Sequence, residues 1–175
     1  NEFERQVKLH TDKIQELFGK RPTALFNSEL IYSDEIGEVV SKMGFKTMLI
    51  DEAKHIMGWK SPNYVYNHSY LPKLKLLVRN HKLSDDIAFR FRSLSLNAEN
   101  FVSWITRLPE SEQVINLGMG YEAFGIINSA QSGIFDFLKA LPYHAMEQGI
   151  SFALPSEIGK KHESAGALSV PYPIS

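Results

Sequence analysis

The sequence predicts an α/β fold with a mostly parallel sheet. Short apolar runs alternate with amphipathic segments of helical period along most of the chain. No turn signal typical of a β-hairpin joins one apolar run to the next. The run 74–78 is almost continuously apolar, as expected for a strand that is covered on both faces. Together these observations favour strands that run parallel and are connected by helices.

The first fifty residues contain two helix–strand pairs. In the first helix, Val7, Ile14 and Leu17 recur at helical spacing, and Gly19 supplies a stop signal. Ser33 is a good N-cap for the second helix, whose first turn is acidic. The expected elements are a helix over 3–18, a strand over 23–26, a helix from Ser33 to Gly44 and a strand over 47–50.

The rest of the chain continues the same alternation. Asn97 is expected to cap a helix with Phe101 and Trp104 on one face. Pro142 suits the first turn of a helix that Gly149 ends. The further expected elements are a strand over 74–78, a short helix begun by Ser84, Asp85 and Asp86, a strand over 114–117, a helix over 132–140, a strand over 151–153 and a last helix capped by Ser156.

Two stretches do not follow this alternation. Residues 54–73 contain Gly58, Pro62 and four aromatic residues without a regular period, which is typical of a long functional loop. Residues 164–175 contain two prolines and predict no closing element, so the sheet would keep an unpaired edge. We therefore expect residues 1–175 to form a single partial domain that belongs to a larger fold.

Composition and charge exclude several classes of partner. A net charge of -1 and a pI of about 6.7 provide no basic footprint for nucleic acid and no attraction to an anionic membrane. No apolar run approaches the roughly 20 residues that a membrane span needs. Cysteine is absent, which excludes disulfides and thiolate metal sites and fits a reducing compartment. We expect a cytoplasmic protein without nucleic-acid or membrane partners, without a metal and without another cofactor.

Polar side chains gather after the expected strands, where ligands bind in parallel α/β folds. Glu29 directly follows a strand and has Tyr32 nearby, so its carboxylate could project into a cleft beside an aromatic ring. Helix-terminal charge or a salt bridge is the commoner role for such a residue. Asp85 and Asp86 could hold sugar hydroxyls or a metal, and stabilisation of a helix N-terminus explains them as well. Loop aromatics such as Tyr121 suit stacking against sugars, or local packing.

Several catalytic motifs are missing from the sequence. None of the six histidines lies three or four residues from another, so no helix presents a histidine pair to zinc. The chain has no glycine-rich dinucleotide motif, no P-loop and no serine nucleophile elbow. Nucleotide-dependent enzymes and serine-triad enzymes therefore have no support.

An ordered set of segments resembles glycoside hydrolase family 57, in particular its α-amylases. Residues 26–32, FNSELIY, are similar to the family segment FRNTELIY. Residues 116–125, NLGMGYEAFG, are similar to NLFMDYETFG, and the stretches GIFDFL and LPSEI follow at the same places as GIFEFL and TPSEV in the family. Between them, Arg79, Asn80 and residues 83–91 resemble the family segment RN…LSDDIAFRF. The order of these segments makes the resemblance specific.

This resemblance implies part of a distorted, seven-stranded (β/α) barrel without its first strand and without the family's C-terminal helical region. It implies action on α-glucans such as starch, glycogen or maltooligosaccharides by a retaining mechanism, in which one carboxylate attacks the anomeric carbon and a carboxylic acid protonates the leaving oxygen. Glu29 would be the nucleophile. The residues expected to bind substrate are Tyr32, Arg79, His81, Asp85, Asp86 and Tyr121.

The family's catalytic acid is missing. The aspartate of DYETFG corresponds to Gly120, and Ala123, Ile126 and Ile127 replace the polar residues that follow it. Loss of a general acid typically removes about 10²–10⁴ in rate, so we expect impaired hydrolysis. Glu122 is a candidate substitute, because residues two apart point the same way in an extended segment.

Three alternatives stay open at this point. The first is a non-catalytic protein that binds or senses α-glucans with the same cleft. The second is a polysaccharide deacetylase, whose metal site would need a histidine pair that the sequence lacks. The third is a purely structural α/β domain, which the retained Glu29 and the aromatic loop disfavour.

Overall fold

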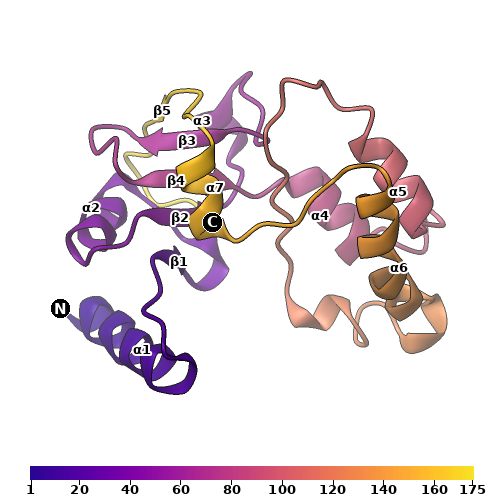
Figure 1. Ribbon diagram of the computed structural model, residues 1–175, viewed down its shortest axis with the longest axis horizontal. Helices are drawn as coiled ribbons and strands as arrows, with labels where there is room; N and C mark the ends of the chain where they lie inside the picture. The colour runs from indigo at the N-terminus through magenta and orange to yellow at the C-terminus, as the bar shows by residue number, and fades with distance from the viewer. The chain divides into compact units, whose positions relative to one another are not determined.

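A computed structural model describes all residues from Asn1 to Ser175 and divides them into two compact units (Figure 1). The first unit comprises Asn1–Val78 and Leu154–Ser175, and the second comprises Arg79–Ala153. All five strands belong to the first unit, whereas the second is built from helices and loops. None of the helices has the length and apolar character that a membrane crossing requires. The α/β class is confirmed, and the expectation that both units belong to a single partial domain stays a prediction.

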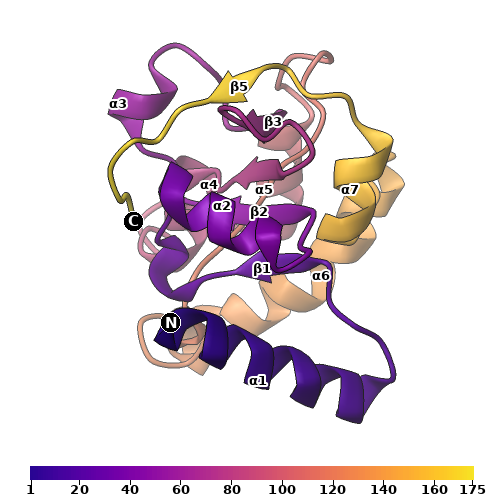
Figure 2. The same ribbon diagram turned by 90° about the vertical axis from the view of Figure 1, so that its left-hand side faces the viewer.

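The sheet of the first unit has the strand order β1-β2-β4-β3-β5 (Figure 2). Its strands are β1 (Ala24–Phe26), β2 (Thr47–Ile50), β3 (Val65–His68), β4 (Lys75–Val78) and β5 (Ala167–Leu168). Strand β2 runs parallel to both β1 and β4, β3 runs antiparallel to β4, and β5 runs parallel to β3. The mostly parallel sheet predicted from the sequence is therefore confirmed, and it fits a part of a (β/α) barrel.

The first unit contains four α-helices and one 3₁₀ turn, and Ser33 caps one of the helices as predicted. They are α1 (Glu2–Phe18), the 3₁₀ turn η1 (Ser28–Leu30), α2 (Asp34–Lys42), α3 (Lys54–Met57) and α7 (Pro155–Lys161). The Ser33 hydroxyl accepts a hydrogen bond from the N–H of Ile36, as its N-cap role predicts. Gly19 ends α1 with a φ of 69°, a left-handed conformation that favours glycine. Helix α7 contacts β2 and β4.

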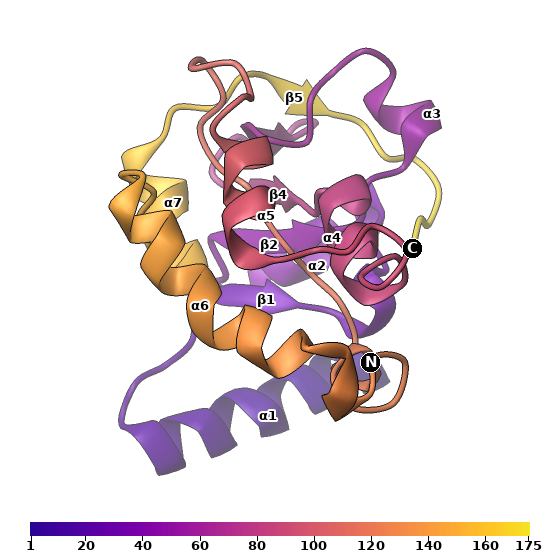
Figure 3. The same ribbon diagram turned by 90° about the vertical axis from the view of Figure 1, so that its right-hand side faces the viewer.

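The second unit packs three helices around an apolar core (Figure 3). They are α4 (His81–Ala88), α5 (Ala98–Ile105) and α6 (Ile134–Glu147), with 3₁₀ turns η2 (Tyr121–Ala123) and η3 (Ala130–Ser132) between α5 and α6. The core contains Ile87 of α4, Phe101 of α5 and Phe137 of α6. The rings of Phe101 and Phe137 meet edge to face at 5.7 Å, a favourable arrangement for aromatic pairs.

Two segments expected to be irregular complete the sheet instead. The expected loop over 54–73 contains α3 and β3, and Val65 and Tyr66 of β3 are buried. The expected open tail over 164–175 contains β5, and Tyr32 forms an antiparallel bridge with Ile174 beyond it. These predictions were wrong because both strands are short and lie between turn residues, so only their pairing partners stabilise them.

Other local predictions also change. Helix α4 starts at His81 with Asn80 as its N-cap, so the expected cap at 84–86 lies inside the helix. Residues 114–117 and 151–153 form no strand; the former contribute only an isolated bridge between Asn116 and Arg79. The two helices expected around Pro142 form the single helix α6, because Phe137 and Ala145 anchor both halves to the core side. Ser156 lies inside α7, which begins at Pro155.

Gly37 lies on the buried face of α2, where a side chain would not fit. A Cβ atom there would lie 2.5 Å from a ring carbon of His68 and 2.8 Å from the Tyr32 hydroxyl. We expect Gly37→Ala to lower the free energy of unfolding by about 1–3 kcal/mol, the usual cost of overpacking, which exceeds the gain of about 1 kcal/mol in helix propensity. Urea denaturation of the natural protein measures the change, and Glu35→Ala on the exposed side of α2 is the control. An unchanged or higher midpoint for Gly37→Ala would contradict the close packing.

Candidate active site

Glu29 stands in an unusual backbone conformation directly after β1. It has a φ of 52° and a ψ of 21°, and the following Leu30 has a φ of 55°, so two consecutive non-glycine residues are left-handed. Such residues cost of order 1–3 kcal/mol each and persist where the surrounding structure determines them. The Leu30 side chain is buried, whereas Glu29 is exposed to solvent. The strain therefore presents the Glu29 carboxylate at the end of a parallel strand, where this class of fold binds ligands.

The loop that holds Glu29 is closed by a single side chain. The Asn27 carboxamide oxygen accepts a hydrogen bond from the N–H of Ser28, and its Nδ2 donates to the carbonyl of Ile31 at 3.0 Å. On the downstream side, Tyr32 exchanges two backbone hydrogen bonds with Ile174, of 3.0 and 2.9 Å. Both ends of the loop are thus attached to regular structure.

Tyr32 is placed below this loop and not at the surface. Its side chain is fully buried, and its hydroxyl has no hydrogen-bond partner. Burial, together with the negative charge of Asp34, raises the pKa of Tyr32 well above its usual range, so the phenol stays neutral. The substrate contact expected of Tyr32 stays a prediction, and in this structure the side chain lies in the core.

The aromatic residues of 54–73 separate into packed and exposed rings. The hydroxyl of the buried Tyr66 donates to the carbonyl of Ser61 at 2.6 Å, whereas Trp59 is almost completely exposed. Tyr70 donates to the Glu38 carboxylate, and this hydrogen bond raises the pKa of Tyr70 to about 12. Of these rings, Trp59 is the most exposed.

In the second unit, three residues predicted to bind substrate form one hydrogen-bonded cluster. The Arg79 guanidinium donates to Asp85 Oδ1 at 2.6 Å and lies 3.1 Å from Nδ1 of His81. Nε2 of His81 lies 3.1 Å from Asp85 Oδ2. Because a guanidinium only donates, Nδ1 of His81 accepts and Nε2 carries the hydrogen. The side chains of Arg79 and Asp85 are mostly buried, and that of His81 is half exposed.

This cluster also fixes the segment that leads to Gly120. Arg79 Nε donates to the carbonyl of Gly118 at 2.6 Å, and the N–H of Gly118 donates to the Ser84 hydroxyl at 3.1 Å. Asp86, by contrast, lies outside the cluster and pairs with Lys82 and Arg90. Its predicted contact with substrate therefore has less geometric support than that of His81.

Glu122 occupies the space that a side chain at position 120 would enter. Gly120 precedes the 3₁₀ turn η2, and a Cβ atom built on it would collide with the Glu122 carboxylate. The segment is a turn and not the extended chain expected from the sequence, yet it still directs the Glu122 side chain back over Gly120. The carboxylate of Glu122 thus lies where the first atom of a side chain at position 120 would be.

The loop that follows exposes large apolar side chains to solvent and buries the polar side chain of Asn128. Tyr121 and Ile126 are 95% and 81% exposed, whereas Ala123 is buried. The buried Asn128 amide donates to the carbonyls of Ala88 and Ala123, at 2.8 and 3.0 Å. No local sequence pattern marks Asn128 as a site residue, because two of its partners, Ala88 and Ile87, lie 40 and 41 residues away.

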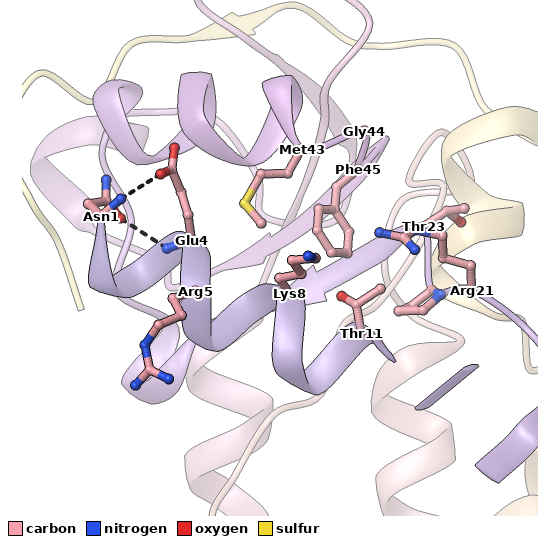
Figure 4. Close-up of a pocket in the computed structure, with 11 residues that line it drawn as sticks. Asn1, Glu4, Arg5, Lys8, Thr11, Arg21, Thr23, Met43, Gly44 and Phe45 are labelled. Carbon is pink, nitrogen blue, oxygen red and sulfur yellow. Dashed lines mark hydrogen bonds and ion pairs between the residues drawn. The ribbon is translucent and has the colours of Figure 1, made fainter. Parts of the chain in front are cut away.

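A cavity in the first unit lies between α1 and the end of α2 (Figure 4). It has a volume of about 480 Å³, and Met43 and Phe45 face Lys8 and Thr11 across it. None of the predicted site residues lines it. Among residues 1–175, no group of three or more His, Cys, Asp or Glu side chains is arranged to hold a metal ion.

Known proteins resemble this chain in sequence and in fold. A protein of Methanocaldococcus jannaschii described as "Putative alpha-amylase" is 34% identical over 176 residues, covering 97% of this chain and 37% of that protein. The crystal structure of the 4-alpha-glucanotransferase from Thermococcus litoralis shares the fold with a TM-score of 0.72 at 15% identity, over 94% of this chain and 26% of that one. This chain therefore spans well under half the length of both proteins.

The family match covers almost all of the chain. The sequence pattern of glycosyl hydrolase family 57 matches residues 1–171, which include the segments around Glu29 and Gly120. This agreement removes the support for a polysaccharide deacetylase. The chain belongs to glycosyl hydrolase family 57.

Proposed function

We propose that this chain is the α-glucan-active part of a retaining glycoside hydrolase in which Glu29 is the nucleophile and hydrolysis is weakened by Gly120. The family and the α-amylase relative support a starch-like, glycogen-like or maltooligosaccharide substrate. The retaining reaction forms a bond between a carboxylate oxygen and the anomeric carbon, and water then hydrolyses this ester.

The conformation of Glu29 is the observation that supports this proposal most. An exposed carboxylate on a left-handed backbone, at the end of a parallel strand, is costly unless its position matters. A salt-bridge partner or helix-terminal charge needs no such backbone, and no ion pair of Glu29 is formed in this structure. A nucleophile, in contrast, requires a fixed position relative to the sugar.

Glu122 supports a residual proton-transfer step. Its carboxylate lies over the Cα atom of Gly120, so it fills the start of the space that an aspartate side chain would take. A glutamate that reaches back from two residues downstream would deliver a proton less accurately than an aspartate at position 120, which predicts slow hydrolysis and not its complete loss.

The experiment compares maltooligosaccharide hydrolysis by the full-length natural protein and by its Glu122→Gln variant. We expect slow hydrolysis in the natural protein and a further loss of about 10²-fold in the variant, because glutamine donates no proton. The control substrate is an aryl α-glucoside with an acidic leaving group, which departs without a proton. Its hydrolysis rate should fall far less in the variant. Equal rates for both proteins on maltooligosaccharides would exclude Glu122 as the acid.

A second candidate function is α-glucan binding without turnover. Gly120 and the exposed apolar Ile126 favour it, because both replace polar positions of the family loop. This function would be selected if the natural protein binds glucan but releases no detectable product from maltooligosaccharides or from the aryl α-glucoside.

A further inference from the structure

A buried polar network surrounds Asp34 in the first unit, and the proposed reaction does not use it directly. Asp34 is the first residue of α2 and is 8% exposed. Its Oδ2 accepts hydrogen bonds from the Ser69 hydroxyl at 3.0 Å, from the Ser169 hydroxyl at 3.3 Å and from the N–H of Val170 at 3.1 Å. One carboxylate oxygen therefore ties α2 to two segments that are 35 and about 135 residues away in the sequence.

The backbone of Asp34 extends the same network. Its N–H donates to the carbonyl of Val170 at 2.8 Å, and its carbonyl oxygen lies 2.9 Å from Nε2 of His68. Because a carbonyl only accepts, His68 carries its hydrogen on Nε2, while Nδ1 accepts the N–H of Tyr70. Asp34 thus joins the start of α2, the turn after β3 and the segment after β5 through five hydrogen bonds.

The segment that Asp34 holds is also the one that anchors the Glu29 loop. Val170 is bonded to Asp34, and Ile174, four residues later, forms the two backbone hydrogen bonds with Tyr32. Only Leu30 and Ile31 separate Tyr32 from Glu29. If residues 168–174 moved, the downstream end of the left-handed loop would lose its partner, and the strain at Glu29 would be free to relax.

We propose that Asp34 is a positioning residue for Glu29, which acts by fixing residues 168–174 against the downstream end of the Glu29 loop. The proposal rests on the proposed role of Glu29 as nucleophile. It explains why a carboxylate is buried at this site, where burial of a charged group is costly unless several donors satisfy it. Three donors satisfy one of its oxygens, Oδ2, whereas the other oxygen, Oδ1, is buried without a hydrogen-bond partner.

The test measures how fast Glu29 reacts with 5-fluoro-α-D-glucosyl fluoride in the full-length natural protein. Fluoride leaves without a proton, so the label forms on the nucleophile regardless of Gly120 and Glu122. We expect Asp34→Asn to slow labelling by about 10- to 100-fold, with little change in the reagent concentration that gives half-maximal rate, because misplacing a reacting group by about 1 Å has an effect of this size. Glu35→Gln removes a charge from the same turn of α2 without touching the network and should label like the natural protein.

Amide hydrogen exchange on the same proteins tests the positioning role of Asp34 separately from the role of Glu29 as nucleophile. Asp34→Asn should speed exchange in residues 28–32 and leave β2 unchanged. Absence of label on the natural protein would reject Glu29 as nucleophile, and the exchange rates would then decide the positioning role alone. Unaltered labelling and exchange in Asp34→Asn would overturn the proposal. If that variant does not fold, Ser169→Ala removes a single donor and should slow labelling by a few-fold.

Discussion

Gly120→Asp is expected to increase maltooligosaccharide hydrolysis by the natural protein by about 10²–10⁴-fold, the usual contribution of a general acid. The backbone at Gly120 has a φ of -70° and a ψ of 154°, which any residue adopts, and it precedes a 3₁₀ turn, where aspartate is a favoured cap. The one obstacle is the Glu122 carboxylate, the end of a flexible side chain that can rotate away.

Gly120→Asn is the matched control for this gain. Asparagine has the shape of aspartate but carries no acidic proton, so we expect no increase in hydrolysis. An equal gain with asparagine would mean that the side chain acts through packing. No gain with aspartate, in a variant that still binds glucan, would favour the function of binding without turnover.

Glu29→Gln is expected to remove covalent labelling and to lower hydrolysis by more than about 10³-fold, because an amide oxygen is a poor nucleophile toward the anomeric carbon. Glutamine has the same length and branching as glutamate, so the left-handed turn and the packing of Leu30 should be kept. Mass spectrometry after reaction with the glucosyl fluoride measures the label, and reducing-end assays measure hydrolysis.

The result is interpretable only if the variant still binds glucan. Binding within about threefold of the natural protein would show that the loss is chemical, since losing a hydrogen bond to a charged group weakens binding by about tenfold or more. Glu29→Gln that retains natural activity would remove Glu29 from the mechanism and would leave its left-handed backbone without a functional reason.

The sequence predicted the local features that depend on neighbours along the chain. Ser33 and Asn97 cap helices as expected, because a cap needs only a side-chain oxygen and an N–H three residues away. The same type of reasoning failed for Asn80 and Pro142. Helix α4 starts at the cap Asn80, earlier than Ser84, Asp85 and Asp86 suggested. Pro142 lies inside α6, which has buried residues on both sides of the proline.

Some features of the candidate site could likewise be predicted from the sequence, and others could not. Glu29 was predicted from its place after a strand and from the family segment around it, and Arg79, His81 and Asp85 were each expected to bind substrate. Only the structure showed that these last three residues form one hydrogen-bonded cluster. The structure buries Tyr32, which the sequence could not show, because sequence does not tell whether an aromatic ring next to a loop points outward or into the core. Its contact with substrate stays a prediction. The sequence predicted that the Glu122 side chain points in the direction of position 120, but it predicted this for an extended segment. The structure has a 3₁₀ turn there instead, and the side chain still lies against Gly120.

By itself, the sequence determined the fold class, the family and the positions of β1, β2 and β4, since these follow from periodicity and from ordered segments. That Gly120 takes the place of the family acid stays a prediction. Only the tertiary structure decided that β3 and β5 complete the sheet, that Glu29 is strained, and that Asp34 joins residues far apart in the chain. The physical reason is that short strands, strained turns and buried carboxylates are unfavourable on their own. They form because hydrogen-bond partners from distant segments compensate them, and such partners leave no local pattern.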